Sequence, residues 1–530
     1  MNFSPRLPFH GLSYREQEYA QSANRKLAHR NLQTPIDSND YEAADVSIAQ
    51  ALENILSILP DESDINDLIG PIEGTGEEKL REVGFRARIF KASFEAWEAL
   101  HLRPIQDQIF VYENTLQYLK RNTELSARLK WDHNDMTHVY EKYRYFLTRL
   151  SMRLFPWTMP YFPDLTTLHS QFWNGDQGLV FTAGNHQALY LLTSIQSLRK
   201  MGCELPIEVM YLGDSDLGEE YRRKLEAING VITRDLSSMI NDEGWKLAGW
   251  AAKPFAILLS SFREAIFIDA DSLFLRDPAV LFQDPGYQST GALFFKDRIF
   301  QPAFKKSWLK RILPTPVSSL VRKNRFWTGE SSHMQESGVV VVDKWKHFSA
   351  LLVICRMNGP DRDGNKDEGR VGDKETFWLG WELVGDTGYA FHDGNVAVMG
   401  TAEVEQPSDQ FDEREAHSHE LRDIDSQPTK AKFTICAPQM LHLDMAGRPL
   451  WFNGWVLPNK FSGDPHLQPV NFESFLGEPS DVGGDGAWKL RPSNVFCLSA
   501  DHLSNFTTAE KSILDSMVEL AKGVGAISVV

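Results

Sequence analysis

The apolar residues of the chain follow two different patterns, which meet near Gly178. Before that point they recur with the spacing of one helix face, as in Ile48, Leu52, Ile55 and Leu59. Apolar residues three or four positions apart in a mixed segment predict an amphipathic helix. No set of catalytic side chains stands out before residue 170. We therefore expect a flexible leader over residues 1–40 and a helical stem or packing module over residues 41–170.

After Gly178, short apolar runs alternate with amphipathic helical patterns. Three of the runs are typical of buried strands: GLVFTAG (178–184), IEVMYLGD (207–214) and AIFIDAD (265–271). Strands that alternate with helices favour an open, mostly parallel α/β sheet. Later runs, such as GALFF (291–295), are shorter. We expect an α/β catalytic domain over residues 171–475 and a C-terminal extension over residues 476–530.

Size and charge exclude some classes of protein. A chain of 530 residues is too long for one hydrophobic core, so we expect more than one domain. The chain has 55 Lys and Arg against 72 Asp and Glu, and the formal net charge is −17. An acidic surface repels phosphate backbones, so we expect no nucleic acid partner. No apolar run reaches the roughly 18 residues that a membrane helix needs, so we expect no spanning segment in this chain.

The cysteines limit the kinds of metal or redox site. Cys203, Cys355, Cys436 and Cys497 are far apart and form no C-x-x-C pair. This spacing excludes a zinc ribbon or a thioredoxin-type site. An even number of cysteines allows disulfides, and buried free thiols account for them equally well.

The sharpest chemical signal is the acidic motif IFIDADSLFLRDP at residues 266–278. An apolar strand runs directly into Asp269 and Asp271. In open α/β sheets, ligands bind beyond the carboxyl ends of the strands. Two neighbouring carboxylates repel each other, and a divalent cation such as Mn²⁺ or Mg²⁺ removes that penalty. The motif therefore predicts a metal site that also binds a diphosphate.

A second class of enzyme also places D-x-D after a strand. Haloacid dehalogenase-like phosphatases use the first Asp as a nucleophile, and their motif usually continues with Gly-Thr. Here it continues with Ser272 and Leu273, and several strand–helix units come before it. These differences favour the metal–diphosphate interpretation over the phosphatase.

Several further blocks resemble one known family. Together with the acidic motif, the blocks that follow one another in order are 178–214, TGALFFKDR (290–298), QESGVVVVDK (335–344), GDKETFWLGWELVGD (372–386) and LHLDMAGRPLWFNGW (441–455). They resemble the fungal α-mannosyltransferase family that includes the Golgi α-1,3-mannosyltransferases. The resemblance covers about residues 165–465. Several blocks in order are more specific than any one of them.

The resemblance implies a fold and a reaction. The fold is a glycosyltransferase A-type fold, with a Rossmann-like mixed sheet flanked by helices. The donor is GDP-mannose, the cofactor is Mn²⁺ with Mg²⁺ as the alternative, and the acceptor is a mannose-containing glycan. Transfer retains the α configuration and forms an α-1,3 linkage. An α-1,2 linkage and a non-catalytic glycan-binding relative stay open.

The resemblance also implies a location. Members of the family are anchored in the Golgi by one membrane helix, with the catalytic part in the lumen. This chain begins MNFSPRLPFHG and has no such segment. We therefore expect an N-terminus that is truncated or incomplete.

Residue types and resemblance together give the candidate metal and donor site. By resemblance to related A-type folds, His442 is the third metal ligand beside Asp269 and Asp271. A core histidine is the structural alternative. The predicted nucleotide-sugar contacts are the small residues Thr182, Ala183 and Gly184, the cation Lys253, and Asp269 and Ala270 of the motif. Small residues let the backbone approach a nucleotide, and a lysine neutralises phosphate. A solvated surface lysine is the alternative for Lys253.

The remaining candidates concern the transferred sugar and the acceptor. Asp373, Glu375 and Glu336 lie in the later blocks, where a carboxylate can face the sugar or hold the acceptor hydroxyl. Trp378, Trp451 and Asn453 are weaker candidates for acceptor binding, since most tryptophans belong to a core.

Overall fold

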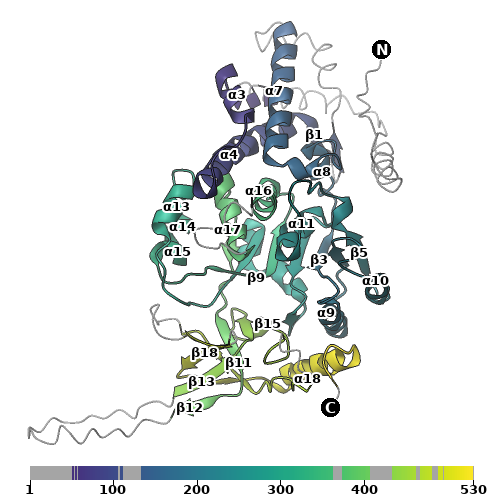
Figure 1. Ribbon diagram of the computed structural model, residues 1–530, viewed down its shortest axis with the longest axis vertical. Coiled ribbons are helices and arrows are strands. Elements are labelled where there is room, and N and C mark those ends of the chain that lie inside the picture. The colour runs from purple at the N-terminus through teal and green to yellow at the C-terminus, as the bar shows by residue number, and fades with distance from the viewer. Residues whose placement is uncertain are drawn as a thin grey trace, which may run out of the picture. The chain divides into compact units, whose positions relative to one another are not determined.

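The computed structural model describes most of the chain after residue 50 (Figure 1). The described residues are 51–105 except 53, 56 and 57, then 108–111, 133–361, 373–405, 432–460, 466–479, 488–492 and 495–528. The leader predicted over residues 1–40 lies outside them. Two compact units can be distinguished: residues 1–73, 86–174 and 235–246 make one, and residues 74–85, 175–234 and 247–530 make the other.

The first unit is mainly helical. Its elements are α3 (Glu62–Ile69), α4 (Gly76–His101, whose first turns belong to the second unit), β1 (Leu102–Ile105), β2 (Gln108–Val111), α7 (His133–Leu154), η1 (Pro156–Thr158), α8 (Leu165–Ser170) and η2 (Leu236–Ser238). Aromatic rings join α4 and α7, with Trp97 stacked on Tyr143 at 5.9 Å between ring centroids. The antiparallel hairpin of β1 and β2 was not predicted from the sequence.

The second unit is built on a seven-stranded sheet in the order β10-β8-β9-β6-β3-β4-β5. The strands are β3 (Gln177–Thr182), β4 (Ile207–Tyr211), β5 (Val231–Asp235), β6 (Glu264–Ile268), β8 (Ala292–Lys296), β9 (Gln335–Asp343) and β10 (Ala390–Phe391). Strand β3 runs parallel to β4 and β6, whereas β9 runs antiparallel to β6 and β8. The predicted α/β class with a mixed sheet is confirmed.

The second unit also contains helices, and several of them pack on the strands of this sheet. The helices are α9 (Ala188–Lys200), α10 (Glu219–Glu226), η3 (Gly249–Ala251), α11 (Ala252–Leu259), η4 (Pro278–Gln283), α12 (Pro285–Thr290), α13 (Lys306–Ile312), α14 (Ser319–Lys323), α15 (Arg325–Thr328), α16 (Phe348–Asn358) and α17 (Asp373–Val384). Helix α16 packs between α11 and α17. Strand β9 is buried at all nine positions, as expected of a strand covered on both faces.

Two smaller antiparallel sheets follow. One has the order β19-β16-β11-β14-β15-β7 and the other β12-β13-β18-β17. Their strands are β7 (Ser272–Phe274), β11 (Val396–Gly400), β12 (Glu403–Glu405), β13 (Lys432–Ala437), β14 (Met440–Leu443), β15 (Pro449–Asn453), β16 (Ser474–Gly477), β17 (Trp488–Arg491), β18 (Val495–Ala500) and β19 (Ser504–Asn505). Helix α18 (Thr508–Gly523) packs against α9. Strand β16 spans the domain boundary predicted at residue 475.

The four cysteines divide into one disulfide and two thiols. Cys436 and Cys497 face each other on β13 and β18 and form a disulfide across 61 positions of sequence. Cys203 and Cys355 are buried and free. Burial raises the pKa of both thiols, so neither is a ready nucleophile.

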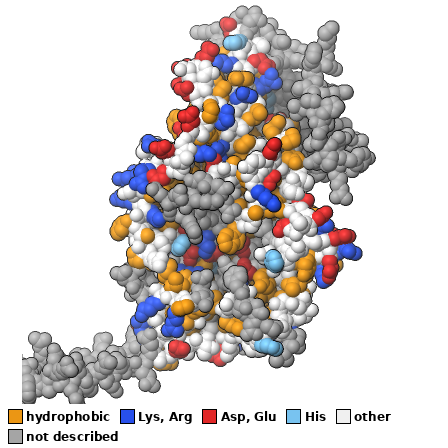
Figure 2. All heavy atoms as spheres, viewed as in Figure 1, with side chains coloured by type: hydrophobic (Ala, Val, Ile, Leu, Met, Phe, Trp, Pro, Cys, Tyr) orange, Lys and Arg blue, Asp and Glu red, His pale blue; other side chains and the backbone are white. Residues whose placement is uncertain are grey.

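The surface charge is uneven in spite of the acidic total. Exposed Lys and Arg side chains gather over α13–α15 (Figure 2). Within the described ranges, no helix combines the length and the apolar character that crossing a bilayer requires.

Candidate functional site

Asp269 and Asp271, here called the motif pair, lie in a turn held by backbone bonds. They follow the buried strand β6 directly. The Asp269 N–H donates to the Gly338 carbonyl of β9 at 2.8 Å, and the Trp455 N–H donates to the Asp271 carbonyl at 3.3 Å. The turn is therefore fixed between two sheets, and both side chains stand at the carboxyl end of β6, as the sequence predicts.

Each carboxylate of the motif pair has its own lysine. Lys253 lies in the first turn of α11, and its Nζ donates to Asp269 Oδ2 at 2.9 Å and to Ser337 Oγ at 3.4 Å. Lys460 pairs with Asp271. The Lys253 side chain is 5% exposed, so it is not the solvated surface lysine that the sequence left open.

The donor chemistry of the motif pair fits a divalent cation. Hard carboxylate oxygens suit Mg²⁺ and Mn²⁺, and the Asp269 and Asp271 side chains keep 19% and 18% of their surface exposed. Among the residues that the structure describes, no group of three or more His, Cys, Asp and Glu side chains is placed to share a metal ion. The described part of the chain therefore offers the two carboxylates of the motif pair to such an ion.

His442 does not join the motif pair. It lies on β14 opposite Trp451 of β15, and Trp451 in turn faces Phe274 of β7. Strand β15 thus separates the histidine from the strand that carries the motif. The His442 ring stacks on Trp451 at 4.1 Å, and its Nε2 has no hydrogen-bond partner among the described residues. Burial lowers the pKa of His442 to about 3.

The predicted nucleotide contacts stand at the neighbouring strand end. Thr182 ends β3, which is parallel to and paired with β6, so the carboxyl ends of both strands open on the same edge of the sheet. At Gly184 a Cβ atom would lie 2.6 Å from Asp216 Oδ1, so glycine is needed for the close approach of these two loops. Ala183 and Ala270 are both buried in the sheet core.

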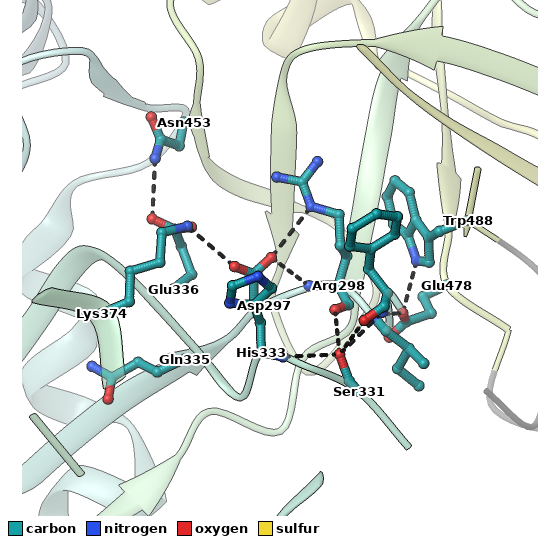
Figure 3. Close-up of polar contacts among 12 residues, drawn as sticks. Asp297, Arg298, Ser331, His333, Gln335, Glu336, Lys374, Asn453, Glu478 and Trp488 are labelled. Atoms are coloured by element: carbon teal, nitrogen blue, oxygen red, sulfur yellow. Dashed lines mark hydrogen bonds and ion pairs between the residues drawn. The ribbon is translucent and has the colours of Figure 1, made fainter. Parts of the chain in front are cut away.

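Glu336 lies at the centre of a second polar group, beside the motif pair. Its carboxylate accepts hydrogen bonds from Lys374 Nζ at 2.5 Å and Asn453 Nδ2 at 3.0 Å (Figure 3). It also accepts from the Gly338 N–H at 2.9 Å. The carbonyl of the same Gly338 accepts from Asp269. Asn453 is paired with Ser272 across β15 and β7. The structure thus brings the predicted residues Glu336 and Asn453 next to the acidic motif.

Two members of this group, Asp297 and Lys374, were not predicted from the sequence. Asp297, which follows β8, accepts from Lys374 Nζ at 3.1 Å and from Arg298 Nε at 3.2 Å. Burial alone would raise the pKa of Asp297, but Lys374 and Arg298 hold it below its usual value. Asp297 stands in the family block TGALFFKDR and Lys374 in the block GDKETFW. Their place in these blocks was the one sign in the sequence that they could belong to the site. Asp297, Glu336 and Lys374 are called the Lys374 cluster below.

Glu375 and Asp373 have different positions from that cluster. Glu375 is buried, and its oxygens accept from the Met334 N–H at 2.9 Å and from Trp378 Nε1 at 2.5 Å. Its hydrogen bonds therefore fix the entry to β9. Asp373 begins α17, and its side chain lies outside the described residues.

The tryptophans are core residues. Trp378 and Trp451 are 0% exposed, and Trp451 is enclosed by His442, Phe295 and Phe274. Both rings are enclosed in the core, so neither presents a free face for the acceptor stacking predicted for them. Asn453 alone of the three acceptor candidates lies beside the polar network.

Comparison with known proteins gives the family. The family described as "Mannosyltransferase putative" matches residues 176–444, which is half of the chain and contains both the motif pair and the Lys374 cluster. The match does not favour the phosphatase alternative.

Curated relatives agree with this match. The protein named "Putative alpha-1,3-mannosyltransferase MNN1" of Candida albicans is 30% identical over 59% of this chain and 42% of its own length. The alpha-1,3-mannosyltransferase MNT2 of Saccharomyces cerevisiae is 25% identical over 67% of this chain and 65% of its own length. The chain thus spans less than two thirds of either relative.

Solved structures are similar only at a low level. The core-mannan synthase A of Aspergillus fumigatus, in a form titled Mn/GDP, has a TM-score of 0.27 and 14% identity over 41% of this chain and 72% of its own. The mannosyltransferase Ktr4p of S. cerevisiae has a TM-score of 0.28 and 12% identity over 41% of this chain and 68% of its own. At these scores the likeness adds nothing to the match of sequence. On that match, and in agreement with the blocks seen in the sequence, the chain belongs to the mannosyltransferase family.

Proposed function

We propose that this protein is a metal-dependent, retaining mannosyltransferase of A-type fold that moves mannose from GDP-mannose to a mannose-containing glycan and forms an α-1,3 linkage. The observation that carries the proposal is the position of the motif pair, which follows a buried strand inside the segment that matches the mannosyltransferase family. The names of the two relatives support the linkage.

The motif pair and its lysines form the diphosphate end of the site. Asp269 and Asp271 would hold Mn²⁺, or Mg²⁺ as the alternative, and Lys253 and Lys460 supply positive charge beside them. A bound divalent cation stabilises the negative charge that develops on the departing diphosphate. The two lysines also neutralise the carboxylates before donor binding, which limits the repulsion between them.

The burial of Glu336 supports a front-face route. In that route the bond from the sugar to the diphosphate breaks, the acceptor oxygen bonds to the same carbon on the same face, and the diphosphate takes the acceptor proton. A covalent intermediate would instead need a carboxylate that can reach the sugar. Glu336 is 1% exposed and accepts three hydrogen bonds, so it is poorly placed to attack.

We also propose that the protein works in the secretory pathway, in the Golgi lumen. The Cys436–Cys497 disulfide fits an oxidising compartment, because cytosolic thiols are kept reduced. The fungal relatives named as mannosyltransferases support a role in glycosylation.

A donor screen tests the function. The protein is incubated with several nucleotide sugars, Mn²⁺ and a mannose-terminated oligosaccharide, and release of nucleoside diphosphate and transfer of sugar are both measured. We expect GDP-mannose to be fastest and a chelator to stop the reaction. Faster release of UDP from a UDP-sugar would contradict the donor assignment. Hydrolysis of simple phosphate esters without sugar transfer would indicate the phosphatase instead.

A further inference from the structure

The Lys374 cluster contains a cation held by two buried carboxylates. The ammonium donates to Asp297 and to Glu336, whose side chains are 6% and 1% exposed. The Lys374 side chain itself keeps 35% of its surface exposed. The carboxylates are therefore covered, and the lysine is the member of the cluster that a ligand can reach.

Among the described residues, the geometry leaves one N–H donor of Lys374 for a ligand. An ammonium group has three N–H donors, and two of them are directed to Asp297 and Glu336. No other contact of this side chain is found in the part of the chain that the structure describes. Because two carboxylates fix the ammonium from the buried side, its third N–H is aimed with little remaining freedom.

The charge balance indicates what kind of oxygen this donor suits. Burial by itself lowers the pKa of Lys374, but Asp297 and Glu336 together raise it above its ordinary value, so the ammonium stays charged. Its charge is already offset by two carboxylates, so a phosphate gains little from it. A neutral hydroxyl still gains a charge-assisted hydrogen bond. Lys253 and Lys460, which lie against the motif pair, are the cations placed for the diphosphate.

A single residue, Gly338, links the cluster to the diphosphate end. The Gly338 N–H donates to Glu336, and the Gly338 carbonyl accepts from Asp269. In a nucleotide sugar, the hexose is attached directly to the diphosphate. A hexose whose diphosphate lies at the motif pair is therefore within reach of this cluster.

We propose that Lys374 contacts the substrate and donates its remaining N–H to a hydroxyl oxygen of the sugar carried by the nucleotide donor. This inference rests on the proposed function, and it assigns the sugar end of the same site. Asp297 acts through Lys374 and is a positioning residue, since it holds the ammonium in place.

Calorimetric titration in the presence of Mn²⁺ separates the sugar from the diphosphate. GDP and GDP-mannose are titrated into wild type, Lys374→Met and Lys374→Arg. We expect Lys374→Met to leave the Kd for GDP unchanged and to weaken GDP-mannose binding about 10- to 100-fold, as for loss of a charged hydrogen bond. Lys374→Arg keeps the charge and should recover part of the loss.

Two variants control for damage to the fold. Lys344→Met removes a fully buried lysine, which bonds to Ser260 at the other end of β9, and should leave both affinities unchanged. If Lys374→Met fails to fold, the double variant Lys374→Met/Asp297→Asn removes one of the two carboxylate charges that loss of the lysine leaves unpaired. It should fold and still show the selective loss of GDP-mannose affinity.

The outcomes are distinct. Equal weakening of GDP and GDP-mannose would place Lys374 on the diphosphate and overturn the proposal. Unchanged donor binding with a raised KM for the acceptor would assign it to the acceptor, which also overturns it. If wild type binds a UDP-sugar and not GDP-mannose, the proposed donor is wrong. The same comparison between UDP and that UDP-sugar then tests Lys374 independently.

Discussion

The motif pair and the Lys374 cluster use the same kinds of side chain in opposite ways. In the motif pair each carboxylate has a lysine of its own, and 18–19% of the carboxylate side chains is exposed. In the Lys374 cluster two carboxylates share one lysine and are at most 6% exposed. A carboxylate that is partly exposed can exchange its lysine for a metal ion. A buried carboxylate that shares its lysine with a second carboxylate cannot exchange the lysine for a metal ion without leaving a buried charge unpaired.

The largest expected effect is loss of the motif pair. Asp271→Asn should lower turnover by about 10²- to 10³-fold or more, since it removes a charged ligand where the diphosphate develops charge. Thermal stability without metal should change little, because the change also relieves repulsion in the pair. Nucleoside diphosphate release and thermal unfolding measure the two effects. Asp277→Asn, a helix-capping change in the same motif, is the control. Half of the wild-type activity in Asp271→Asn would remove the motif pair from the site.

The four-stranded sheet β12-β13-β18-β17 sharpens the comparison, because among the described residues it contacts the Lys374 cluster through Arg298. The Arg298 guanidinium lies 3.6 Å from the centre of the Phe496 ring and bonds to Asp297. Phe496 is next to Cys497 of the disulfide. Cys436→Ser/Cys497→Ser should therefore cost about 2–4 kcal/mol of unfolding free energy. It should weaken GDP-mannose binding more than GDP binding.

Denaturant unfolding and the two calorimetric titrations measure these effects. Cys203→Ser, which changes a buried free thiol, is the control for loss of a cysteine without loss of a cross-link. Equal loss of GDP and GDP-mannose affinity would show that the sheet supports both ends of the site.

The contrast between the two groups also shows what the sequence could predict. Asp269 and Asp271 directly follow an apolar run, and a strand end is visible from local pattern alone. The pairing of Asp297 with Lys374 joins segments 77 positions apart, which no local pattern reveals. The family blocks marked both segments as relevant but did not say that they meet.

The order of the strands explains why His442 and Trp451 lie elsewhere than their predicted roles require. The motif pair follows β6 and His442 lies near the end of β14, and the family resemblance implied that they share a metal. In the fold β15 lies between β14 and β7, and the order of strands in a sheet does not follow from their order in the chain. The same sheet encloses Trp451, which therefore has no free face. Burial of a tryptophan by residues distant in sequence is likewise not visible in a periodicity.

A smaller effect separates the lysines of the two groups. Lys253→Met should weaken GDP binding about 10-fold, as for loss of one charged contact, and GDP-mannose binding by the same factor. Lys374→Met should affect GDP-mannose alone. Calorimetric titration of both variants side by side measures the difference. Surface lysine Lys522, whose partner is Glu519, gives the control variant Lys522→Met. A Lys253→Met variant with wild-type GDP affinity would contradict its place at the diphosphate end.

The smallest expected effect concerns His442, which lies in the core away from the motif pair. Its pKa is about 3 in the folded chain and near ~6.5 when unfolded, so the unfolded state binds more protons between these values. Stability is therefore full above pH ~6.5 and falls as the pH drops, by about 1 kcal/mol between pH ~7.5 and ~5.5. His442→Phe fits the aromatic surroundings and should remove this part of the pH dependence without changing the Mn²⁺ affinity. Denaturant unfolding without metal at several pH values and Mn²⁺ titration of activity measure the two properties. If His442→Phe weakens Mn²⁺ binding, the histidine reaches the metal in the loaded enzyme. In that case β15 must move to bring it there.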